Sequence, residues 1–138
     1  MASISVDIGS ESLILVVDDD GGTRRFLCTV LRHTTGARVL EAASPAEAMS
    51  LARSAGRPVD MLISDIALSA DRNGIELAHE MAAAYPAMRV LLISGGDLPE
   101  AGIPADWRFL AKPFALAVFL DCVHDLCSAA QRAEAYSV

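Results

Sequence analysis

The chain has 138 residues, of which 53% are hydrophobic and 21% charged, and its formal net charge is −7. This length is enough for one domain with its own apolar core, which leaves no room here for a second catalytic or DNA-binding domain. The 18 acidic side chains outnumber the 11 basic ones, and no run of basic residues interrupts them. Such a surface repels phosphate backbones, so we expect no nucleic acid among the ligands.

The cysteines and the N-terminal region bear on the cellular compartment. Cys28, Cys122 and Cys127 lack the C-x-x-C spacing and lie in apolar helical segments, which favours reduced thiols. No basic residue precedes Arg24, and the apolar run at 13–17 is too short for a membrane span or a signal sequence. We therefore expect a cytoplasmic protein that does not associate with membranes.

The first half of the chain alternates predicted strands with predicted helices. Residues 13–17 are apolar at successive positions, which is typical of a strand buried on both faces of a parallel sheet. A helix with one apolar stripe follows, from a start near Asp20 to an end at Gly36. Residues 37–40 form a weaker strand. The sequence SPAE at 44–47 then begins a second helix, with a capping box and a proline at the first helical position.

The second half continues this pattern with one interruption. Gly56 and Pro58 end the second helix, and Pro86 ends a third that carries apolar residues from 75 to 82. Strands are predicted at 61–63, 90–93 and, more weakly, 109–111, and a last helix is predicted from 116 to 127. Three glycines and two prolines lie between Ile93 and Phe109, and they disfavour a full helix there. Repeated β-α units predict a doubly wound parallel sheet.

Polar residues follow the predicted strands where ligands of open α/β sheets bind, beyond the carboxyl ends of the strands. They are Asp18, Asp19 and Asp20 after the first strand, then Asp65, Ser94 and Lys112 after later ones. Crowded carboxylates repel one another unless a hard cation lies between them, and this supply of ligands suits Mg²⁺. Lys112 is the only lysine of the chain and offers a compact ammonium, while Ser94 offers a hydroxyl donor.

These groups together predict a site for phosphoryl transfer. A carboxylate would be the nucleophile, a metal would neutralise the transferring oxygens, and an ammonium and a hydroxyl would hold them. Asp65 is the favoured nucleophile because it stands alone after its strand, whereas the cluster at 18–20 is better suited to the metal.

Four ordered motifs then resemble the receiver domain of two-component response regulators. They are VVDDD at 16–20, ISD at 63–65, ISG at 93–95 and KPF at 112–114. The resemblance extends over residues 12–128 and implies a flavodoxin-like strand order 2-1-3-4-5, with the fourth helix short or missing. Residues 1–11 would be an N-terminal extension, and residues 129–138 a tail that continues the last helix.

The resemblance also implies a role for each site residue. Asp65 would accept the phosphoryl group. Mg²⁺ would be held by Asp19, by Asp65, by the Ala67 carbonyl and, through water, by Asp18. Ser94 and Lys112 would contact the acyl phosphate. Ser94 and Phe109 would change position in the switch, and the bond between Lys112 and Pro113 would be a cis peptide.

The implied function is signalling. A histidine kinase or a histidine phosphotransfer protein, or a small phosphodonor, would phosphorylate Asp65, and the new charge would change a protein-binding surface. The domain would catalyse its own phosphorylation and dephosphorylation without being a metabolic enzyme. We expect a stand-alone receiver that is a monomer or a weak dimer.

The sequence departs from the family pattern in two places. Ser69 stands where the family usually has proline, and Gly74 comes one position later than the usual glycine, so the loop after the acceptor is one residue longer. The segment between Ser94 and Lys112 is shorter than is typical. Within that segment we expect Trp107 to fold back onto the domain.

Two other functions stay open at this point. In a haloacid-dehalogenase-like phosphatase, Asp18 would be the nucleophile and Asp20 the acid/base, but no later strand supplies the further acidic pair that such enzymes use. In a degenerate receiver, the domain would serve as a constitutive interaction module. The intact set of Asp, Ser and Lys residues argues against that loss of chemistry.

Overall fold

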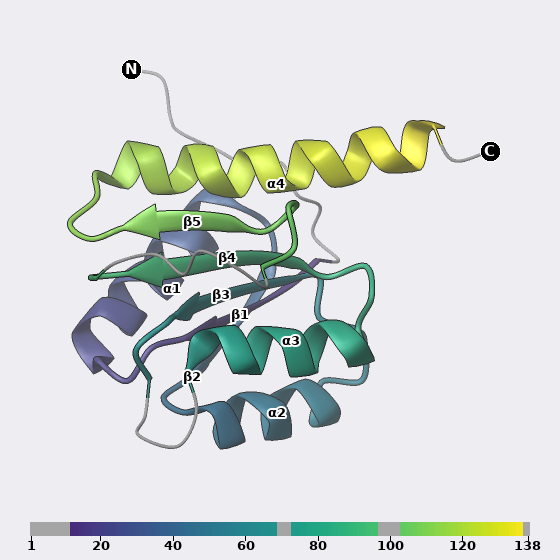
Figure 1. Cartoon of the computed structure of the whole chain (residues 1–138). Coiled ribbons are helices and arrows are strands. Elements are labelled where there is room, and N and C mark those ends of the chain that lie inside the picture. Colours follow the sequence, from purple (N-terminus) through teal and green to yellow (C-terminus); the bar gives the residue numbers. More distant parts are fainter. Residues whose placement is uncertain (1–11, 69–72, 97–102, 137–138) are drawn as a thin grey trace.

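The structure is a computed structural model that describes residues 12–68, 73–96 and 103–136. Its sheet has five parallel strands in the order β2-β1-β3-β4-β5, which confirms the predicted fold class (Figure 1). The strands are β1 (Leu13–Val17), β2 (Arg38–Ala42), β3 (Met61–Asp65), β4 (Arg89–Ser94) and β5 (Arg108–Ala111). Every residue of β1 and β3 is buried, as the unbroken apolar runs predicted for central strands.

Four helices connect or follow the strands in the described part of the chain. They are α1 (Gly21–Thr34), α2 (Pro45–Ser54), α3 (Gly74–Ala84) and α4 (Leu116–Tyr136). Ser44 caps α2 through a bond from the Glu47 amide, and Pro45 is at its first turn, as predicted. The reciprocal capping box occurs instead at α3, between Asn73 and Glu76, where we had not predicted it.

The end of α1 differs from the prediction. Gly36 does not form a left-handed cap, because Gly56 is the only described residue with a positive φ. The helix ends at Thr34, and both the amide and the hydroxyl of Thr35 donate to the carbonyl of Leu31. A threonine side chain therefore satisfies the terminal carbonyl that we had assigned to a glycine turn.

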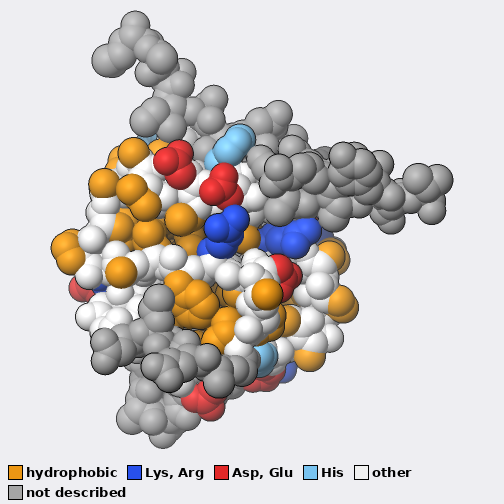
Figure 2. All heavy atoms as spheres, turned by 45° about the horizontal axis from the view of Figure 1, so that its top comes forward, with side chains coloured by type: hydrophobic (Ala, Val, Ile, Leu, Met, Phe, Trp, Pro, Cys, Tyr) orange, Lys and Arg blue, Asp and Glu red, His pale blue; other side chains and the backbone are white. Residues whose placement is uncertain are grey.

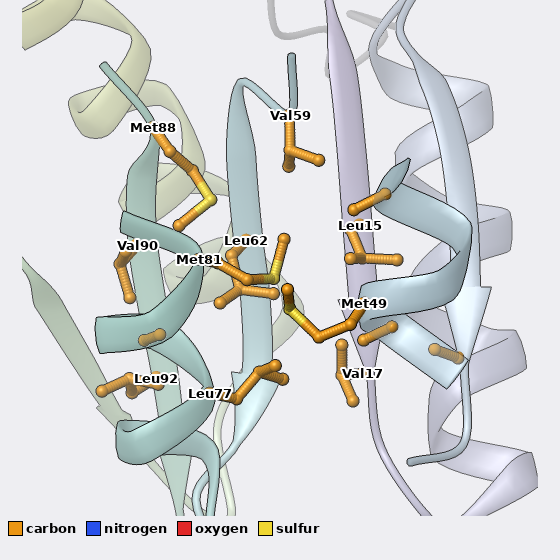
Figure 3. Packing of buried hydrophobic residues seen from close by; sticks show 14 of the residues in the cluster. Leu15, Val17, Met49, Val59, Leu62, Leu77, Met81, Met88, Val90 and Leu92 are labelled. Atoms are coloured by element: carbon orange, nitrogen blue, oxygen red, sulfur yellow. The ribbon is translucent and has the colours of Figure 1, made fainter. Parts of the chain in front are cut away.

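Two helices pack on each face of the sheet. α1 and α4 cover one face, and their core includes Leu27 and Phe119 against Ile14 and Ile63 (Figure 1). α2 and α3 cover the other face. There, Met49, Met81 and Met88 fill the space against strand residues such as Leu15 and Leu62 (Figure 3). Successive strand residues thus contribute to opposite cores. The helices cover both faces of the sheet, and the polar groups lie at its carboxyl edge.

The segment between β4 and β5 contains no helix in its described residues, 95–96 and 103–107. The rest of it, and the loop position of Ser69, lie outside the described residues. Trp107 is buried and belongs to the α2/α3 core, with its ring 4.7 Å from that of His79 on α3. The expectation that Trp107 folds back onto the domain is confirmed.

The described residues on the face seen in Figure 2 carry dispersed charges. Figure 2 looks onto the α4 side and shows basic side chains lying beside acidic ones, with apolar side chains between them. Leu116 and Val118 on α4 are among the exposed apolar residues. None of the helices in the described part of the chain has both the length and the apolar character that a bilayer span requires.

Candidate phosphoryl-transfer site

The polar residues predicted for the site lie at the carboxyl ends of four strands. Asp18 and Asp19 follow β1, Asp65 is the last residue of β3, and Ser94 is the last residue of β4. Lys112 follows β5, and its amide donates to the Ser94 carbonyl at 2.8 Å. Parallel strands end at one edge of a sheet, so residues that are far apart in the sequence gather there.

The three carboxylates form a compact cluster. One oxygen each from Asp18, Asp19 and Asp65 lies within 4.8 Å of the others. Asp18 and Asp65 are buried, whereas Asp19 is exposed. Oδ1 of Asp18 accepts a 2.9 Å bond from the Asp20 amide, but Oδ2 has no hydrogen-bond partner although it is buried. A buried carboxylate oxygen without a donor is costly unless a cation binds it.

Burial raises the pKa of Asp18 above its usual 3.8. The bond from the Asp20 amide opposes this rise, and the nearby charge of Asp65 adds to it. Burial therefore destabilises the ionised form of Asp18. A cation bound at Oδ2 would stabilise that form.

Lys112 supplies the cation that the protein itself holds at the cluster. Its Nζ donates to Oδ2 of Asp65 at 3.1 Å and lies 4.0 Å from Oδ2 of Asp18. Burial favours the neutral amine, but the hydrogen bond to Asp65 and the surrounding carboxylates outweigh it and raise the pKa of Lys112. The Lys112–Pro113 peptide bond is cis.

The remaining predicted residues lie around this cluster. The Ser94 hydroxyl is buried and exchanges two 3.1 Å bonds with the backbone of Gly96. Ala67 is exposed two residues beyond β3, and Phe109 is partly buried against the α2/α3 core. Apart from the lysine, no described basic residue forms an ion pair with a carboxylate of the cluster.

Asp20 lies next to the cluster but has a structural role. Its side chain caps α1 by accepting from the amide and the hydroxyl of Thr23. These two bonds lower the pKa of Asp20. A carboxylate that is ionised and occupied in this way is a poor acid/base, which argues against the phosphatase hypothesis.

Two residues that we had not assigned to the site support it. Gly74 begins α3 so close to β3 that a Cβ atom there would lie 2.2 Å from the Asp65 carbonyl oxygen. Arg24, in the first turns of α1, donates from Nη1 to the Asp18 carbonyl at 2.8 Å. The sequence carries no signal for this role of Arg24, because its two acceptors lie in the β1-α1 loop and in β2.

The donor set fits Mg²⁺. This ion prefers a few carboxylate oxygens and keeps several waters, and the cluster offers one exposed carboxylate beside a buried oxygen that lacks a donor. In this fit, Asp18, Asp19 and Asp65 would hold the ion, with Ala67 contributing its carbonyl as the family resemblance implies.

Comparison with known proteins identifies similar sequences in one protein family. The family profile of the response regulator receiver domain matches residues 14–124. The sensor kinase CckA of Brucella abortus (strain 2308) is 29% identical over 126 residues, which cover 88% of this chain but only 13% of CckA. The chain thus spans a small part of that relative.

Solved structures agree with this match. The receiver domain of the hybrid histidine kinase CckA superposes with a TM-score of 0.71 at 28% identity, covering 84% of this chain and 99% of that one. The non-phosphorylated HemR receiver domain of Leptospira biflexa gives 0.69 at 27% identity, covering 86% and 95%. A CheY-like receiver of Methanospirillum hungatei JF-1, at 21% identity, shares the fold with a TM-score of 0.73, covering 88% and 97%.

Fold and site together define a two-component signalling module with an acidic pocket at the carboxyl edge of its sheet. The chain belongs to the response regulator receiver domain family.

Proposed function

We propose that the protein accepts a phosphoryl group on Asp65 and thereby switches a protein-binding surface. The observation that carries this proposal is the cluster itself. One oxygen from each of three carboxylates lies within 4.8 Å of the other two. A buried oxygen of Asp18 lacks a hydrogen-bond donor, and the Lys112 ammonium contacts Asp65. The family match to receiver domains supports the same chemistry.

The chemical step is a displacement at phosphorus. A carboxylate oxygen of Asp65 attacks the phosphorus of a phosphohistidine on a histidine kinase or a phosphotransfer protein. A new O–P bond forms, the P–N bond breaks, and the histidine nitrogen leaves with the electron pair and takes up a proton. Water later attacks the acyl phosphate and releases inorganic phosphate, which restores the carboxylate.

The residues around Asp65 have separate tasks in this step. Lys112 would follow the charge from the Asp65 carboxylate to the phosphoryl oxygens, because its Nζ already lies 3.1 Å from Oδ2. Ser94 would exchange its bonds with Gly96 for one to a phosphoryl oxygen. Bound Mg²⁺ would neutralise charge that develops on the transferring oxygens.

The switch would pass from the site to the surface through β4 and β5. We propose that movement of Ser94 toward the phosphoryl group opens space into which Phe109 turns, since Phe109 is only partly buried. A partner would then recognise the altered surface around β5.

Intact-mass spectrometry tests the proposal. The protein is incubated with Mg²⁺ and acetyl phosphate, quenched in denaturant and weighed. We expect one phosphoryl adduct, which Asp65→Asn abolishes, and which Asp18→Asn forms more slowly. Asp121→Asn, an exposed carboxylate on α4, is the matched control and should behave like the unchanged protein.

Two outcomes would contradict the proposal. Rapid turnover of phosphate esters that persists in Asp65→Asn would indicate a phosphatase. Absence of any adduct while Mg²⁺ still binds would indicate a degenerate interaction module.

A further inference from the structure

Arg24 is a cation close to the acidic cluster that takes no part in the chemistry proposed above. Its side chain is 16% exposed although it belongs to a surface helix. Nη1 donates to the Asp18 carbonyl at 2.8 Å, and Nε donates to Oε1 of Glu41 on β2 at 3.2 Å. One planar guanidinium thus bridges the β1-α1 loop and the end of β2, a geometry that the fixed fork of arginine permits.

These contacts complete a closed ring around the Asp18 backbone. The Asp18 amide donates to the carbonyl of Ala42 at 3.1 Å, and Ala42 directly follows Glu41 in β2. The chain therefore holds Asp18 on both sides, by a backbone bond at its amide and by Arg24 at its carbonyl.

A second arginine steadies the far side of the ring. Nη1 of Arg32 lies 3.8 Å from Oε2 of Glu41, and its Nη2 donates to the carbonyl of Val39 at 2.9 Å. Each oxygen of Glu41 thus faces a different guanidinium. This arrangement restrains the Glu41 carboxylate, which in turn restrains Arg24.

The ring acts on the position of Asp18 rather than on its charge. Arg24 contacts the backbone carbonyl of Asp18, and Glu41 balances its positive charge. The unpartnered Oδ2 of Asp18 lies instead 4.0 Å from Nζ of Lys112. Groups that hold a metal ligand in this way commonly govern metal affinity without touching the ion.

We propose that Arg24, held by Glu41, is a positioning residue that fixes Asp18 for divalent-cation binding. The inference rests on the proposed Mg²⁺ site and adds to it residues from β2 and α1. It predicts that loss of the fork weakens cation binding even where the fold and the carboxylates are intact.

Isothermal titration calorimetry with Mg²⁺ on the full chain tests the inference. We expect Arg24→Met to raise the Kd for Mg²⁺ by about 10- to 100-fold. Arg24→Lys keeps the charge but cannot bridge both acceptors, so we expect it not to restore the affinity. Arg25→Met is the matched control, because Arg25 is the exposed neighbour on the same helix, and its Kd should not change.

Glu41→Gln provides a second route to the same answer. It leaves Arg24 in place but removes the charge that orients it, so the Kd should also rise. The double variant should bind no more weakly than Arg24→Met alone, because both act through one ring. Far-ultraviolet circular dichroism checks that each variant is folded, and Glu41→Gln carries the test if Arg24→Met does not fold.

The possible failures are distinguishable. If the unchanged protein binds Mg²⁺ and a folded Arg24→Met binds it equally well, the ring is merely structural and this inference falls alone. If Arg25→Met weakens binding as much as Arg24→Met, the effect does not depend on the contacts of Arg24 and the inference also falls. If the unchanged protein does not bind Mg²⁺, both this inference and the proposed metal site fall.

Discussion

The Nζ atom of Lys112 donates a 3.1 Å hydrogen bond to Oδ2 of Asp65, although 47 residues separate them in the chain. Asp65 ends β3 and Lys112 follows β5, so the lysine side chain reaches across the end of β4. Two strand spacings amount to about 10 Å, which a long side chain can cross only if the intervening residue is small. Ser94 at the end of β4 meets that requirement.

Replacing Lys112 by methionine should slow phosphorylation. The change keeps the length of the side chain but removes the ammonium that contacts Asp65 and faces Asp18. We expect the rate of adduct formation from acetyl phosphate to fall by about 10²- to 10³-fold, measured by intact mass against time. Lys112→Arg should recover only part of the rate, since a guanidinium fork does not fit a point contact. An unchanged rate in Lys112→Met would rule out this role.

The unchanged protein should lose stability as the pH rises because Asp18 ionises, and Asp18→Asn should not show this loss. Because the folded protein raises the pKa of Asp18 above 3.8, the carboxyl contributes stability below that pH and loses it as the pH rises through the raised pKa. The comparison is made with a chelator present, so that no metal is bound. The free energy of unfolding of the unchanged protein minus that of Asp18→Asn should therefore fall as the pH rises. Urea unfolding at several pH values measures it, and a difference independent of pH would contradict the prediction.

At neutral pH, Mg²⁺ should stabilise the unchanged protein more than it stabilises Asp18→Asn. Binding to the folded state alone stabilises a protein by about 2.7 kcal/mol at one hundred times the Kd. We expect this gain in the unchanged protein and a smaller one in Asp18→Asn, because the variant lacks one carboxylate of the cluster. Thermal unfolding with and without Mg²⁺ measures both gains. Equal gains in the two proteins would show that Asp18 is not a ligand.

Replacing Gly74 by alanine should damage the fold and the site together. The new Cβ would lie 2.2 Å from the Asp65 carbonyl oxygen and 2.8 Å from Oγ of Ser64, so α3 must move away from β3. We expect a loss of about 1–3 kcal/mol in the free energy of unfolding and slower phosphorylation of Asp65. Gly96→Ala is the control for stability, because no atom lies within 4 Å of its Cβ position. Equal stability of the two variants would refute the steric argument.

Truncating Trp107 should cost stability although it lies in a connecting segment. Trp107 is 7% exposed, and its ring packs against His79 and the α2/α3 core. Trp107→Ala should lower the free energy of unfolding by about 3–5 kcal/mol, and Trp107→Phe by less, as measured by urea unfolding followed by circular dichroism. A loss no larger for alanine than for phenylalanine would mean that the ring does not contribute to the core.

The amino-acid pattern predicted the sheet and most of the polar residues that lie at its carboxyl edge. Unbroken apolar runs such as 13–17 predict buried parallel strands, because both faces of those strands must meet helices. The polar residues that follow the runs then lie at one edge by topology alone, which brings Asp65 and Lys112 to the same end of the sheet. Local signals also located the start of α2 at Ser44, since a cap involves only neighbouring residues.

The contacts that depend on how helices and strands pack together could be found only in the folded protein. The Arg24 bridge to Asp18 and Glu41 joins a helix, a loop and a strand, and no short-range pattern contains all of them. The need for Gly74 comes from the close approach of α3 to β3. Such contacts are set by distances between elements, which the periodicity of a sequence does not encode.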